Sequence, residues 1–266
     1  MKKNNRLLNA AYLAVDGIVG NMLPRRKPHI LIACMPKSAS TFLASAISEL
    51  PGFRRCRLTP DWGAREQELC AIRLSRYNHN AYVSQHHLRN SGWTQGLIQQ
   101  YNLTSVVLVR NLADCAISIR DHFQKEPGEG PTAFFDESHL AMSNSDFEEA
   151  IVSLAIPWYL NFYAGWKAAG DVPIYDFDDY TGDPVRVMRE ILARASVKIS
   201  ESEAVAALDQ VQKTKTRFNV GETGRGKLLS DAAKDSLSRL LDHYPKYQDD
   251  PLFVKTRQTI AASADS

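Results

Sequence analysis

A short turn near residue 36 gathers groups that can bind an anion. An apolar run of strand type, His29–Cys34, comes before the turn, and residues 42–50 after it have a helical pattern. Strand, tight turn and helix in this order aim backbone N–H groups and the positive end of the helix at one point. We expect a phosphate or sulfate group to bind there. The turn supplies Pro36, Lys37, Ser38, Ala39, Ser40 and Thr41. The alternative is an ordinary helix start rich in capping residues.

This turn differs from the loop that binds nucleoside triphosphates. That loop requires the pattern G-x-x-x-x-G-K-[ST], whereas Cys34, Met35 and Ala39 stand in the region of its glycines. Magnesium-bound triphosphate is therefore a poor fit to the turn.

A second polar group follows the apolar run 105–110. Arg110 lies at the end of this run, and a helix opens near Asp114, where a carboxylate suits the helix dipole. Ser118 lies further along the same helix. An arginine at a strand end and a helix hydroxyl predict a second oxyanion site. The alternative is a helix-capping segment with a surface arginine.

A glycine-rich basic segment, residues 217–231, lies near the C-terminus. Its glycines allow a close approach to a ligand, and the basic residues Arg217, Arg225 and Lys227 surround them. A solvated loop would have a similar composition.

Two adjacent histidines, His86 and His87, come directly after a predicted strand, residues 81–85. Histidine suits a general base near neutral pH. Because neighbouring residues of a strand point to opposite faces, we expect one of the two to face the site, and we favour His87.

The composition is that of an ordinary globular protein. The 266 residues carry a net charge of +2, with 44% hydrophobic and 23% charged residues, so charge alone gives no reason to expect nucleic-acid binding. The four cysteines form no C-x-x-C pair and no metal-ligand spacing. We expect free thiols, a cytoplasmic location and no metal site.

The apolar pattern predicts an α/β domain. Strand-like runs at 29–34, 81–85, 105–110 and 172–177, with a weaker one at 53–58, alternate with helical patterns at 42–50, 64–75, 114–123, 147–169 and 184–195. Such alternation is typical of a central parallel sheet, which binds ligands at the carboxyl ends of its strands. The turn, Arg110 and the histidine pair all lie at such ends.

The remaining segments have separate roles. Residues 1–28 read as an amphipathic helix and a basic linker, for which docking on the domain is favoured over contact with a membrane surface. Residues 29–250 form the predicted domain, with a flap over the acceptor at 125–146, and residues 251–266 form a tail.

The three motifs together resemble those of sulfotransferases that use 3′-phosphoadenosine 5′-phosphosulfate (PAPS). PKSAST resembles the family's PKSGTT loop, which holds the 5′-phosphosulfate. The spacing R-N-x-x-D-x-x-x-S resembles the 3′-phosphate site and implies that Arg110 and Ser118 bind that phosphate. Residues 217–227 resemble the loop R-K-G-x-x-G-x-x-K over the nucleotide, with two extra residues before the first glycine. This resemblance implies that Arg225, Gly226 and Lys227 bind the nucleotide.

The resemblance also implies catalytic roles. Aligning the family's K-T-H-L-P segment makes His87 the base, with His86 as the alternative, and places Gln85 where relatives have a lysine. Lys37 would then stabilise charge on the leaving group. Phe42 replaces a tryptophan that stacks on adenine. Lys255 and Thr259 match part of the family's dimer motif, so a homodimer is an open alternative.

The sequence thus predicts a three-layer, P-loop-like α/β sulfotransferase that needs no metal. It would transfer a sulfuryl group from PAPS to a small-molecule, lipid or carbohydrate hydroxyl, with no nucleic-acid partner. A P-loop-type nucleotide kinase and a catalytically silent nucleotide-binding protein are the alternatives.

Overall fold

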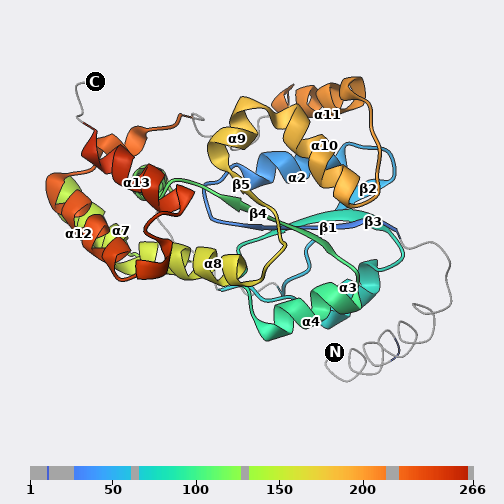
Figure 1. Ribbon diagram of the computed structural model, residues 1–266, viewed down its shortest axis with the longest axis horizontal. Helices are drawn as coiled ribbons and strands as arrows, with labels where there is room; N and C mark the ends of the chain where they lie inside the picture. The colour runs from blue at the N-terminus through green and yellow to red at the C-terminus, as the bar shows by residue number, and fades with distance from the viewer. Residues whose placement is uncertain (1–10, 12–26, 61–65, 127–131, 214–221, 263–266) are drawn as a thin grey trace.

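The structure is a computed structural model that describes residues 11, 27–60, 66–126, 132–213 and 222–262 (Figure 1). The predicted N-terminal helix, apart from Ala11, and residues 127–131 of the predicted flap lie outside these residues. So do Arg217 and Gly221 of the third motif.

One parallel sheet forms the centre of the described structure. Its strand order is β2-β3-β1-β4-β5, and every neighbouring pair is parallel. All six residues of the middle strand β1 are buried, as expected for a strand that is covered on both faces. The bounds are β1 His29–Cys34, β2 Phe53–Arg55, β3 Ala81–His86, β4 Thr104–Val109 and β5 Ile174–Asp176.

Helices cover both faces of the sheet (Figure 1). One layer contains α2 (Ser40–Ser48), α9 (Phe177–Gly182), α10 (Pro184–Arg194) and α11 (Glu201–Lys213). On the opposite face lie α3 (Ala71–Tyr77), α4 (Gly92–Gln100) and α8 (Ile156–Ala168). Beside α8 the chain adds α5 (Leu112–Lys125), α6 (Glu137–Leu140), α7 (Asn144–Leu154), α12 (Asp231–Asp242) and α13 (Pro251–Ala261).

Alternation along β1 produces two apolar cores. Leu31 and Ala33 pack into the core that includes α5 and α8, whereas Ile32 and Cys34 pack into the core that includes α2 and α10. Successive strand side chains point to opposite faces, so each face acquires its own apolar layer. The predicted three-layer α/β architecture is confirmed.

Several element boundaries differ from those predicted. The helix expected at 64–75 begins only at Ala71. The helix expected at 147–169 is divided at Ala155 into α7 and α8, because Pro157 has no N–H to donate and its ring blocks a continuous helix. The helices α4, α11, α12 and α13 were not predicted.

The described part of the predicted flap is anchored by an aromatic side chain. Phe135 is 5% exposed and packs edge-on against Phe123 and Phe147, at centroid distances of 5.7 and 5.5 Å. The neighbouring Phe134 is 64% exposed. Within the described residues, no helix has the length and apolar character to cross a membrane.

Candidate functional site

The turn after β1 opens its backbone toward the carboxyl edge of the sheet. Lys37 and Ala39 have φ values of 69° and 58°, in the left-handed region. Ala39 is the N-cap of α2, and no side chain caps this helix. The hydroxyl of Ser38 donates to the Met35 oxygen at 2.7 Å and closes the turn. The first N–H groups of α2 therefore lack the side-chain acceptor that usually satisfies them.

The hydroxyl groups of this turn do not all share one environment. Ser38 and Ser40 are buried, and Thr41 is exposed. Phe42 is 8% exposed and lies with its ring centroid 6.4 Å from that of Tyr180, inside the core on the α2 side of the sheet. Its predicted stacking on adenine remains a prediction.

Arg110 joins two of the three predicted motifs. From the end of β4, its Nη1 donates to the Lys37 backbone oxygen at 3.0 Å and its Nη2 to the Glu222 backbone oxygen at 2.8 Å. The guanidinium also lies 4.2 Å from the centre of the Phe177 ring. Its Nε is buried without a hydrogen-bond partner. The structure thus places an unsatisfied cationic donor between the turn and the glycine-rich segment.

Asp114 fastens the glycine-rich segment to α5. Its carboxylate accepts from the N–H of Gly226 at 2.6 Å and from the N–H of Gly224 at 3.0 Å. A Cβ on Gly226 would lie 2.3 Å from the Cβ of Ala113, so only glycine fits at this approach. Arg225 forms an ion pair with Asp121 on the same helix. These contacts bring the third motif beside the second.

Ser118 also lies on α5 and is buried. Its predicted contact with a phosphate remains a prediction, as do the contacts predicted for Arg225 and Lys227.

The two histidines have different environments. His86 is 3% exposed, and its Nε2 accepts from the Leu58 N–H at 2.9 Å and lies 2.7 Å from the Ser84 hydroxyl. Burial lowers the pKa of His86 to about 3. These contacts hold His86 inside the core, and the alternative assignment of the general base to His86 remains a prediction.

His87 lies on the other face, beside the end of β1. Its Nδ1 is 3.0 Å from the Cys34 backbone oxygen and 3.4 Å from the Cys34 sulfur. The backbone N–H of His87 donates to the Gln67 side-chain oxygen at 2.8 Å. Although burial opposes a charged ring, Cys34 raises the pKa of His87 through its charge and hydrogen bonds.

The C-terminal residues that matched a dimer motif are engaged within the chain. Lys255 pairs with Asp176 at 2.7 Å and also with Asp178. Thr259 accepts from the Asn111 side chain at 2.7 Å. Among the described residues, no group of three or more His, Cys, Asp or Glu side chains is arranged to hold a metal ion.

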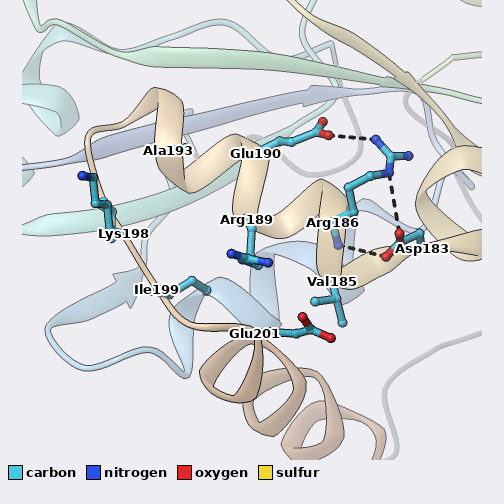
Figure 2. Close-up of a pocket in the computed structure, with 10 residues that line it drawn as sticks. Asp183, Val185, Arg186, Arg189, Glu190, Ala193, Lys198, Ile199 and Glu201 are labelled. Atoms are coloured by element: carbon cyan, nitrogen blue, oxygen red, sulfur yellow. Dashed lines mark hydrogen bonds and ion pairs between the residues drawn. The ribbon is translucent and has the colours of Figure 1, made fainter.

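A separate pocket of about 660 Å³ lies beside α10 and the segment that leads into α11 (Figure 2). Arg186 on its wall bonds to Glu190 at 2.9 Å and pairs with Asp183. None of the residues predicted for the site lines this pocket.

The arrangement of the chain as a whole matches that of known structures. Mouse sulfotransferase SULT7A1, solved in complex with 3′-phosphoadenosine 5′-phosphate (PAP), aligns over 90% of this chain and 91% of its own, at 15% identity and a TM-score of 0.60. The chain has the sulfotransferase fold. A sulfotransferase from Alicyclobacillus acidocaldarius aligns over 91% of this chain and 98% of its own, at 15% identity and a TM-score of 0.47. No protein-family model and no curated protein matches the sequence.

The sulfotransferase fold was predicted from the motifs, but three contacts at its edge were not. They are the hydrogen bond between His87 and the Cys34 oxygen, the hydrogen bond from the Gly226 N–H to Asp114, and the ion pair of Lys255 with Asp176. Strand alternation was the available signal for the first contact. The β1–β3 register sets Ala33 opposite His86, so Cys34 and His87 are the next pair along.

Proposed function

We propose that this chain is a PAPS-dependent sulfotransferase that acts on a hydroxyl acceptor. The observation that carries the proposal is the position of Arg110, whose guanidinium bridges the turn after β1 and the glycine-rich segment. Three motifs that are distant in sequence thereby meet at one edge of a sheet with the sulfotransferase fold. The carboxyl edge of a parallel sheet is where such folds bind their ligands.

The residues at this edge fit a nucleotide with two separate anionic groups. The uncapped start of α2 and Lys37 would hold the 5′-phosphosulfate. The unpartnered Nε of Arg110 and the hydroxyl of the buried Ser118 would hold the 3′-phosphate. PAPS would supply the sulfuryl group, and PAP would remain after the transfer.

His87 would act as the general base. Because a carbonyl oxygen only accepts hydrogen bonds, the Cys34 oxygen requires a hydrogen on Nδ1 of the ring. This tautomer leaves Nε2 with the lone pair that takes the acceptor's proton. Lys37, close enough to lower the pKa of His87 by its charge, would stabilise negative charge on the leaving phosphate.

The kinase alternative has two candidate magnesium ligands after β5, Asp178 and Asp179. Asp178 follows β5 and is the kind of carboxylate that could hold magnesium, but it pairs with Lys255. The sequence also lacks the glycines of a triphosphate loop.

Ligand binding by the whole chain tests the proposal. We expect PAP to raise the melting temperature in the presence of EDTA, and magnesium–ATP to leave it nearly unchanged. Stabilisation by magnesium–ATP alone would contradict the proposal. Labelled PAPS with a panel of alcohols, phenols and sugars would then identify the acceptor.

A His87→Gln variant separates the enzyme from a silent nucleotide-binding protein. We expect it to bind PAP as the wild type does and to lose about 100-fold or more in turnover, the usual contribution of a general base. Unchanged turnover would exclude His87 as the base. The exposed His79, changed to Gln, is the control substitution.

A further inference from the structure

The end of β1 places a buried thiol against the candidate base. Cys34 is fully buried, and its sulfur lies 3.4 Å from Nδ1 of His87. The β1–β3 register, with Ile32 opposite Gln85, puts Cys34, Gln85 and His87 on the same face of the sheet. This contact is therefore built into the strand pairing.

The ring of His87 is held from one side by a single residue. The Nδ1–H points at the Cys34 oxygen at 3.0 Å and can be shared with the sulfur at 3.4 Å. Two acceptors on one residue fix both the tautomer and the orientation of the ring, as the carboxylate does in a Ser-His-Asp triad.

Two side chains in series, Arg55 and Gln85, connect the sheet edge to the same sulfur, and we call them the Arg55–Gln85 arm. Arg55 on β2 donates to Gln85 Oε1 at 3.1 Å. Because a guanidinium only donates, this bond fixes the orientation of the amide and turns its NH₂ group toward Cys34, 3.3 Å away. The oriented amide donates to the sulfur, and the Arg55 guanidinium lies close enough to interact with Cys34 through its charge.

The surroundings act on the pKa values of both groups, and the Cys34 thiol also donates to the His86 backbone oxygen at 3.4 Å. His87 and the hydrogen bonds from Ser40 and Gln85 lower the pKa of the Cys34 thiol against the effect of burial. Lys37 lowers the pKa of His87, whereas Cys34 raises it. Within the described part of the chain, His86 and Tyr159 on α8 are further titratable groups coupled to this pair.

We propose that Cys34 is a positioning residue for the base: its oxygen and thiol orient His87, and the Arg55–Gln85 arm lets the sulfur stabilise the protonated ring. This inference rests on the proposed function. The acceptor hydroxyl gives its proton to Nε2 of His87 while its oxygen forms a bond to the sulfur of the PAPS sulfuryl group. The bond from that sulfuryl sulfur to the phosphate oxygen breaks, and its electron pair stays on the phosphate oxygen. The imidazolium formed in this step then has Cys34 as its partner.

The test compares Cys34→Ser with the wild type. Serine keeps a hydrogen-bonding group but does not ionise in the same range. NMR titration of the His87 ring should show its pKa fall by about one unit in the variant, because an opposite charge is lost while burial and Lys37 remain. Turnover of PAPS should fall about tenfold, a fraction of what a general base contributes, with PAP affinity unchanged. The acid limb of the rate profile should move to lower pH.

Two further variants keep the test decisive. Cys115→Ser changes another fully buried thiol and should leave the His87 titration as it is. Arg55→Met lies on the exposed edge strand, where folding tolerates change, and should move thiolate formation by Cys34, followed by ultraviolet absorbance, to higher pH. An unchanged His87 titration in Cys34→Ser, or unchanged thiolate formation in Arg55→Met, would overturn the inference. Absence of sulfuryl transfer by the wild type would instead overturn the proposed function, and the NMR titration would still decide whether Cys34 controls His87.

Discussion

Arg110 donates a hydrogen bond to the backbone oxygen of Lys37 across 3.0 Å, which ties the end of β4 to the turn after β1. A second bond, to the Glu222 oxygen at 2.8 Å, extends the link to the glycine-rich segment. The two candidate anion sites therefore share one guanidinium. A substitution at this position should disturb both.

Replacing Arg110 with lysine should weaken PAP binding by about 10- to 100-fold, the value of one or two charge-assisted hydrogen bonds. Lysine keeps the charge but lacks the planar fork that reaches two carbonyl groups and still offers Nε. Isothermal titration calorimetry measures the change. Arg186→Lys on α10 is the matched control, since Arg186 is exposed and pairs with Glu190. Equal affinity in the two variants would remove Arg110 from the site.

Two glycine substitutions should have opposite effects on stability. Gly226→Ala should lower the free energy of unfolding by about 1–3 kcal/mol, because its Cβ would meet Ala113 at 2.3 Å. Gly96→Ala should raise it by about 0.5–1 kcal/mol, because Gly96 lies in α4 with open space around it. Denaturant unfolding of both variants tests the pair. A harmless Gly226→Ala would show that the segment does not need its close approach to α5.

Acidification should destabilise the protein through His86. Burial lowers its pKa from 6.5 to about 3, so between these values the unfolded chain binds more protons than the folded one. Stability should therefore fall as the pH drops through this window, with a slope from this residue of at most about 1.4 kcal/mol per pH unit. Denaturant unfolding at a series of pH values measures the slope.

The variant His86→Gln should remove that contribution, because glutamine can accept from the Leu58 N–H without titrating. Its stability should depend less on pH than that of the wild type, at some cost in absolute stability. An identical pH slope in the two proteins would place His86 outside the acid response.

Asn111 has two roles that substitution can separate. Its Oδ1 caps α5 by accepting from the N–H groups of Ala113 and Asp114, and its Nδ2 donates to Thr259 on α13. Asn111→Asp should keep the cap and lose the donor. Asn111→Ala should lose both, at a cost of about 1–2 kcal/mol for the cap. The difference in unfolding free energy between the two variants isolates the cap, and the difference between Asn111→Asp and the wild type isolates the contact with α13. If both are equally destabilised, the cap contributes nothing.

The sheet was largely predictable because a central parallel strand requires a continuous apolar run. β1 begins and ends where predicted, β3 ends one residue later, and β4 begins and ends one residue earlier. The helices were less predictable than the strands. The helices α4 and α11 were missed because their apolar patterns are weak and they depend on packing against the sheet and its covering helices. Pro157 was the sequence signal for the break between α7 and α8 at Ala155. The aromatic residues of α8 continue the helical pattern across that point, so one long helix was predicted.

The sequence by itself determined the types of groups at the site and their order: the turn with Lys37, the strand end with Arg110, and the glycines before Lys227. Local rules suffice for these, since strand, turn and helix signals lie within a few residues. Only the tertiary structure decided which groups meet. Arg110 reaches Glu222 over 112 positions, and Cys34 reaches His87 over 53. Strand order and register set such contacts, and they depend on burying both faces of the sheet at once, which no local pattern encodes.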